Sequence, residues 1–130
     1  MPSDKKDHYW PDTKILIVED DEFNFQFMQA IFHGKGPEIL RAKNGEEALQ
    51  QYHEVDKINL ILMDIQIPVI DGFEVTRRIR GEDPDIPIIA QTAFIHDHEQ
   101  EKCMEAGCSG YISKPVDLGK LLDLVGEHLG

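Results

Sequence analysis

Short apolar runs and amphipathic stretches alternate along most of the chain. The apolar runs are rich in Ile, Leu and Val and are bounded by turn residues, which is typical of strands buried on both faces. The stretches between them place apolar residues at helical spacing, and several end at a glycine. The pattern predicts strands at 14–20, 38–43, 58–65, 86–93 and 110–116, and helices at 21–32, 44–54, 72–81, 96–107 and 117–129.

Strands that alternate with helices in this way indicate an α/β fold, a parallel sheet covered on both faces. Right-handed crossovers make a doubly wound sheet the natural arrangement. With five strands the expected form is flavodoxin-like, with strand order 2-1-3-4-5 and a switch point between the first and third strands. We expect one such domain over residues 13–130, after a flexible lead-in over residues 1–12.

Composition narrows the choice of partner and compartment. The 130 residues are enough for one domain with a core, and the formal net charge of −12 disfavours nucleic acid and anionic membranes as direct partners. No apolar stretch approaches the roughly 20 residues that span a bilayer, and the first residues lack the apolar region of a secretory signal. The two cysteines are expected to be reduced in the cytoplasm.

Polar residues stand where the predicted strands end. Glu19 and Asp20 close the first strand and Asp64 closes the third, while Thr92 and Lys114 lie at the ends of the fourth and fifth. The carboxyl ends of parallel strands share one edge of the sheet, and the first and third strands meet at the switch point. We therefore expect the three carboxylates to converge.

Acids placed so close remain ionised only beside cations. Carboxylate oxygens with open water positions suit Mg²⁺, Lys114 adds a second positive charge, and Thr92 adds a hydroxyl donor. This combination around one carboxylate is suited to handling a phosphoryl group, and it makes Asp64 the expected nucleophile.

Each residue also has an ordinary structural explanation when it is taken alone. Asp20 or Asp21 would cap the first helix, Thr92 would be a plain strand residue, and Lys114 a surface lysine. Their joint placement on separate strand ends favours a functional site.

Four motifs in this order resemble the receiver domains of two-component response regulators. They are "ILIVEDD", "LILMDIQIPVIDGFEVTRRIR", "PIIAQTA" and "EAGCSGYISKP", and the resemblance covers residues 13–129. The second motif and "GYISKPV" are similar to receivers attached to hybrid sensor kinases. The resemblance implies a signalling phosphoacceptor, not an enzyme, which takes a phosphoryl group from a sensor histidine kinase or a histidine phosphotransfer protein.

The resemblance also assigns roles to the matching positions. It implies that Asp64 is the phosphoacceptor and that Mg²⁺ is held by Asp20, Asp64 and the backbone carbonyl of Gln66. Glu19 stands where the family usually has Asp, and its longer side chain is expected to reach the metal through water.

A second group of residues is implied to respond to the phosphoryl group. Thr92 and Lys114 would close on its oxygens and Tyr111 would follow as the switch aromatic. The Lys114–Pro115 bond is often cis in this family. The switch would reshape the face formed by the fourth helix, fifth strand and fifth helix, which is also the surface expected for a homodimer.

Two other classes of protein fit the sequence less well. A haloacid-dehalogenase-type hydrolase needs an acid two residues after the nucleophile, where this chain has Gln66, which is not a proton donor of that kind. A flavin-binding module needs a phosphate-cradling loop after the first strand, where the acidic "EDDEFN" would repel phosphate.

Two further expectations concern the partner and the phosphoryl lifetime. The first helix places Phe23, Phe27 and Ile31 on one side, expected to be core, and Phe25 on the opposite side, expected to be an exposed docking point. Gln66 and Phe94 are expected to border the approach of water to the phosphoryl group, and the large Phe94 should make autodephosphorylation slow.

Overall fold

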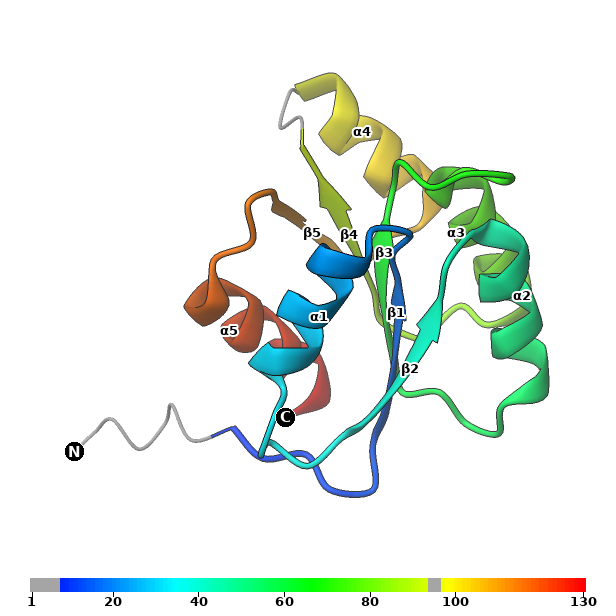
Figure 1. Ribbon diagram of the computed structural model, residues 1–130. Helices are drawn as coiled ribbons and strands as arrows, with labels where there is room; N and C mark the ends of the chain where they lie inside the picture. Colours follow the sequence, from blue (N-terminus) through cyan, green and yellow to red (C-terminus); the bar gives the residue numbers. More distant parts are fainter. Residues whose placement is uncertain (1–7, 94–96) are drawn as a thin grey trace.

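The computed structural model describes residues 8–93 and 97–130 as a sheet between two layers of helices (Figure 1). All the strand pairs are parallel and the strand order is β2-β1-β3-β4-β5, so the predicted fold class and order are confirmed. The strands are β1 (Lys14–Val18), β2 (Glu38–Ala42), β3 (Leu60–Asp64), β4 (Ile88–Thr92) and β5 (Gly110–Ser113); the helices are α1 (Glu22–Ile31), α2 (Gly45–Glu54), α3 (Gly72–Glu82), α4 (Asp97–Ala106) and α5 (Leu118–Leu129).

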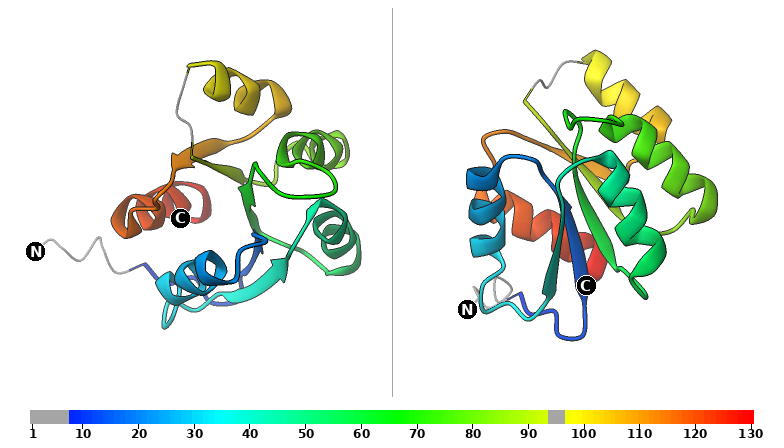
Figure 2. Two further views of the ribbon diagram at one scale, coloured as in Figure 1. Left: turned by 45° about the horizontal axis from the view of Figure 1, so that its top comes forward. Right: turned by 45° about the vertical axis from the view of Figure 1, so that its right-hand side comes forward.

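The two-residue period of the strands divides the core into two clusters. In β1, Ile15 and Ile17 face α1 and α5, while Leu16 and Val18 face the layer of α2, α3 and α4. Figure 2 shows these two helix layers on opposite faces of the sheet. Because both faces are covered, the central strands are apolar at nearly every position and polar residues are left for their ends.

Helix α1 begins at the second of two adjacent aspartates. The carboxylate of Asp21 accepts a hydrogen bond from the backbone N–H of Asn24 at 2.8 Å and is the N-cap. Asp20 is therefore not needed to start the helix, which decides between the two capping assignments that the sequence left open.

The expected orientation of α1 is wrong for its phenylalanines, although Ile31 is buried as expected. Phe25 is buried, with 8% of its surface exposed, whereas Phe23 and Phe27 are 77% and 44% exposed. Phe25 belongs with Met28 and Phe32 to a second stripe at helical spacing, and this stripe faces the sheet. Phe25 is therefore a core residue and not the exposed docking point that the sequence suggested.

Part of the expected lead-in packs on the domain. Trp10 is 4% exposed, its backbone N–H donates to the carbonyl of Lys35 at 2.7 Å, and its ring lies 6.2 Å from that of Phe32. His8 stacks on the indole at 5.1 Å and lies against Gly126, near the end of α5. The chain is thus fastened to α1 and α5 at the end of the sheet away from the strand carboxyl ends.

The helices that the structure describes are all too short or too polar to cross a bilayer.

We predict that Trp10→Ala lowers the free energy of unfolding by about 3 kcal/mol, because it empties a large buried site. Trp10→Phe should cost about 1 kcal/mol, since it keeps an aromatic ring and removes an indole N–H that has no hydrogen-bond partner among the described residues. Urea denaturation measures both changes. The matched control is Tyr9→Ala, one residue away but 66% exposed, and an equal loss in Tyr9→Ala and Trp10→Ala would contradict the packing role.

Candidate functional site

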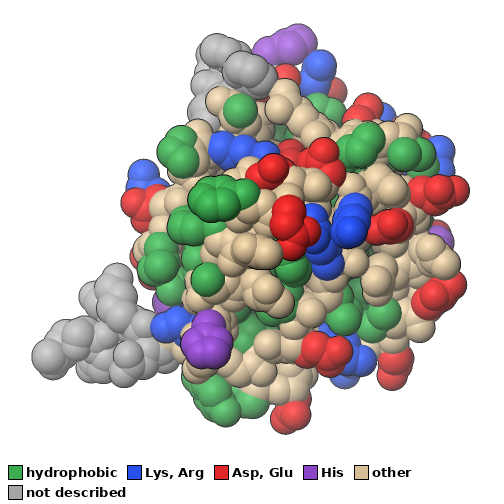
Figure 3. Space-filling view, in the orientation of Figure 1, with side chains coloured by type: hydrophobic (Ala, Val, Ile, Leu, Met, Phe, Trp, Pro, Cys, Tyr) green, Lys and Arg blue, Asp and Glu red, His purple; other side chains and the backbone are tan. Residues whose placement is uncertain are grey.

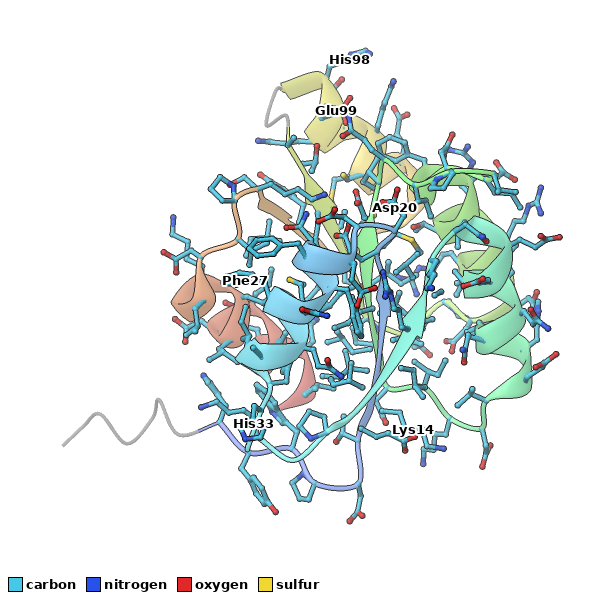
Figure 4. All side chains as sticks on the ribbon, in the orientation of Figure 1. Lys14, Asp20, Phe27, His33, His98 and Glu99 are labelled. Atoms are coloured by element: carbon cyan, nitrogen blue, oxygen red, sulfur yellow. The ribbon has the colours of Figure 1, made fainter. Side chains whose placement is uncertain are left out.

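The strand carboxyl ends bring the three predicted acids together. One carboxylate oxygen from each of Glu19, Asp20 and Asp64 lies within 4.8 Å of the others. Glu19 and Asp20 follow β1 and Asp64 ends the neighbouring β3, so the cluster forms at the expected switch point. Figure 4 shows Asp20 at this edge of the sheet.

Lys114 directly follows the edge strand β5, and its side chain reaches the cluster from there. Its Nζ atom lies 2.9 Å from Oδ2 of Asp64, where it donates a hydrogen bond, and 3.9 Å from Oε1 of Glu19. Asp64 is 2% exposed, so its main counter-charge among the described residues is this ammonium group. A buried carboxylate paired in this way is fixed in position, beside the carboxylates of Glu19 and Asp20.

Glu19 carries the strongest electrostatic perturbation of the site. Burial raises the pKa of its carboxyl group from the ordinary 4.5 to about 7, the Asp64 charge adds to this rise, and the Lys114 ammonium opposes it. Oε2 of Glu19 accepts a hydrogen bond from the backbone N–H of Asp21 at 3.2 Å, while Oε1 is buried without a hydrogen-bond partner among the described residues. The site therefore holds a carboxylate that a cation would stabilise.

The loop after β3 is built close around Asp64. The backbone N–H of Gln66 donates to Oδ1 of Asp64 at 3.0 Å. Gly72 packs so near that a Cβ atom would come within 2.7 Å of the Asp64 carbonyl oxygen. This approach lets α3 begin directly beneath the loop and holds the "IQIPVIDG" turn next to the carboxylate.

The remaining predicted residues lie around this centre or outside the described part of the chain. Thr92 ends β4 with 3% exposure, and its carbonyl accepts a hydrogen bond from the backbone N–H of Lys114 at 2.9 Å. Tyr111 is half-buried in β5 and packs against the core cluster of the α2–α3–α4 layer. The Lys114–Pro115 bond is cis. Phe94 lies outside the described residues.

The donor set fits Mg²⁺. Three carboxylates with hard oxygen atoms lie together, and one of their oxygens is buried without a hydrogen-bond partner among the described residues, which is chemistry that suits this ion. Asp20, Asp64 and the exposed Gln66 loop would supply protein oxygens to the ion. Glu19 is buried next to the two aspartates.

Sequence reasoning missed a groove beside the site. It measures about 440 Å³ and lies between α1 and the connection from β5 to α5; it is lined by Phe23, Asn24, Phe27, Met28, Gln91, Lys114, Pro115 and Val116. Figure 3 shows hydrophobic side chains gathered there, and Figure 4 shows Phe27 directed toward it. Gln91, a polar residue inside an apolar strand, was the one available sequence signal; its buried amide nitrogen has no hydrogen-bond partner among the described residues.

Comparison with known proteins agrees with this geometry. The profile of the response regulator receiver domain matches residues 15–126. The chain is 38% identical over 118 residues to the polar-differentiation response regulator DivK of Brucella anthropi. The aligned region covers 89% of this chain and 95% of that protein.

Solved structures show the same fold. The receiver domain of a sensor histidine kinase from Pseudomonas aeruginosa, crystallised with a magnesium ion in its active-site cleft, has a TM-score of 0.82 and 32% identity over 91% of this chain and 98% of that one. The receiver domain of Ssk1 from Saccharomyces cerevisiae, solved with the histidine phosphotransfer protein Ypd1, has a TM-score of 0.85 and 30% identity, with coverage of 92% and 90%. The chain therefore belongs to the response regulator receiver domain family.

Proposed function

We propose that this receiver domain accepts a phosphoryl group from a phosphohistidine onto Asp64. The observation that carries the proposal is the position of this carboxylate, buried at a strand end, 2.9 Å from the Lys114 ammonium and within 4.8 Å of two further acids. Family membership and the likeness to a magnesium-bound receiver support the same conclusion.

In the proposed reaction an Asp64 oxygen attacks phosphorus, the phosphorus–nitrogen bond breaks, and the electron pair of that bond leaves with the partner's imidazole. Bound Mg²⁺ would neutralise charge on the transferring oxygens. Gln66 holds the carboxylate through its N–H, and Lys114 offers its ammonium to the new phosphoryl oxygens. The chain itself thus supplies the nucleophile, its orientation and one positive charge.

The proposed response starts from Thr92 and Lys114. Both adjoin β5, so their movement toward the phosphoryl group would reach Tyr111, whose ring is half-buried on that strand. The affected face includes α4, β5 and α5, where Met104 and Leu118 are 61% and 52% exposed. We propose this face for output and for homodimer contacts, by a population shift that phosphorylation favours.

We propose that the groove beside α1 docks the donor, a sensor histidine kinase or a histidine phosphotransfer domain. Its apolar wall of Phe23 and Phe27 faces Pro115 and Val116, directly beside Lys114. A helical donor seated there would bring its phosphohistidine over Asp64. The co-crystal of the Ssk1 receiver with Ypd1 shows that a receiver of this fold pairs with such a protein.

Phe94 and Gln66 remain proposed determinants of a slow autodephosphorylation, as the sequence suggested. For compartment we propose the cytoplasm, which is consistent with the free, buried thiols of Cys103 and Cys108.

We predict that Asp64→Asn abolishes labelling by acetyl phosphate in the presence of Mg²⁺, because an amide is a poor nucleophile. Intact-protein mass spectrometry measures the phosphate adduct. The matched control is Asp71→Asn, which makes the same change at the N-cap of α3, where Asn serves as well as Asp. An undiminished adduct in Asp64→Asn would overturn the assignment.

Assays on the same two proteins distinguish a receiver domain from a hydrolase. The parent protein should bind beryllofluoride at Asp64 and should not turn over aryl phosphate esters. Steady ester hydrolysis that is lost in Asp64→Asn would favour the hydrolase instead.

We predict that Mg²⁺ raises the melting temperature more at about pH 8 than at about pH 5. The pKa of Glu19 in the folded protein is raised from its ordinary 4.5 to about 7. Between these two pH values the metal-free folded state therefore binds more protons than the unfolded chain. The resulting stability is complete below pH 4.5 and is lost as the pH rises through about 7. Differential scanning calorimetry with and without Mg²⁺ measures the effect.

Glu19→Gln is the companion variant, because it cannot titrate. Its metal-free melting temperature should change less between these pH values than that of the parent. Equal stabilisation of the parent by Mg²⁺ at both pH values would contradict the placement of the metal beside Glu19.

We predict that Phe23→Ala and Phe27→Ala each slow transfer from a phosphorylated histidine phosphotransfer domain by roughly tenfold, since each removes an aromatic anchor of the interface. Labelling by acetyl phosphate should be unchanged. Rapid-quench transfer assays measure the rates, with Met104→Ala as a control for an exposed apolar side chain on α4. If both donors are affected equally, the groove is not a docking site.

A further inference from the structure

Arg41 is a partly buried arginine in the edge strand β2, and its contacts converge on the acidic loop. It pairs in register with Ile17 of β1, and its side chain is 15% exposed. Burying a guanidinium group is costly unless its donors are used. The question is therefore what this arginine holds.

Its hydrogen bonds go to the segment between β1 and α1. Nε and Nη2 of Arg41 donate to the backbone carbonyl of Glu19 at 3.3 and 3.2 Å, and Nη1 donates to the Glu22 carboxylate at 2.5 Å. The guanidinium carbon also lies 4.4 Å from the centre of the Phe25 ring. One side chain thus binds the loop, the first turn of α1 and the face of α1 that packs on the sheet.

The carbonyl that Arg41 holds is part of the metal-binding segment. A peptide group is planar, so the orientation of the Glu19 carbonyl fixes that of the Asp20 N–H. The N–H of Glu19 donates to the Ala42 carbonyl at 2.9 Å, so β2 fixes the peptide groups on both sides of Glu19. Asp20 follows directly and has an exposed side chain.

We infer that Arg41 is a positioning residue for the Mg²⁺ site, which sets the direction of the Asp20 carboxylate through the Glu19–Asp20 peptide. The inference rests on the proposed function, because it assumes that the acidic cluster binds the metal. Arg41 acts through the backbone and touches neither the metal nor the phosphoryl group.

Electrostatics alone makes the opposite prediction. Arg41 is a cation near the acidic cluster, so its removal would strengthen the binding of a dication. The ion pair with Glu22 offsets much of this charge. The sign of the change in Mg²⁺ affinity therefore distinguishes positioning from charge.

The test is the dissociation constant of Mg²⁺, measured by calorimetry and by the amide NMR shifts of residues 19–21. Arg41→Met keeps the apolar stem but removes the forked donors, and it should weaken binding on the order of tenfold, as loss of supporting contacts around metal sites does. Arg41→Lys keeps the positive charge but lacks the forked guanidinium donors, so its Mg²⁺ affinity should lie between those of Arg41→Met and the parent. In metal-free protein, Arg41→Met should also speed amide hydrogen exchange at residues 19–21.

Two controls isolate the effect. Arg78→Met makes the same charge change in an ion pair with Glu74 on α3, and Trp10→Ala destabilises the fold far from the site; both should bind Mg²⁺ like the parent. Unchanged or tighter binding by Arg41→Met would overturn the inference alone. Failure of the parent to bind Mg²⁺ would overturn the proposed function and the inference with it.

Discussion

The structure depends on a conflict between like charges at the edge of a parallel sheet. Strand order brings Glu19, Asp20 and Asp64 within 4.8 Å, two of them almost completely buried. Such a group is stable only with compensation, which Lys114 supplies in part and a proton on Glu19 supplies further, as its raised pKa indicates. The apolar strands, the caps and the tight loop at Gly72 all hold this unfavourable arrangement in place, and the same arrangement makes the site ready for a metal and a phosphoryl group.

Much of the fold was predictable because its signals are local or purely geometric. Apolar runs ending in acids identified β1 and β3, the right-handed crossover rule indicated a doubly wound sheet, and the common five-stranded form of that sheet supplied the strand order. The convergence of Asp64, Asp20, Thr92 and Lys114 on one edge followed from that order without any knowledge of side-chain contacts.

What could not be predicted were choices between equivalent patterns. Helix α1 carries two aromatic stripes at helical spacing, and only the packing of Phe25 beneath Arg41 and against the sheet decides which one is buried. Trp10 lies in a segment without periodicity, so its burial depends on tertiary contacts, such as that with the Phe32 ring, which no local pattern reports. The proposed role of Arg41 was hidden for the same reason, because a charged residue among the others of "EILRAK" looks like an ordinary edge-strand residue.

The packing of His8 and Trp10 against α1 and α5 has a practical consequence for handling the molecule. The described chain enters the domain beside Gly126, and α5 ends nearby at Leu129, so both ends lie opposite the acidic edge (Figure 1). Linkers and surface tethers attached at these two points would leave α1, the groove and the phosphoacceptor facing open solution. A receiver immobilised through either end would therefore present the same unobstructed face to every donor in a binding array.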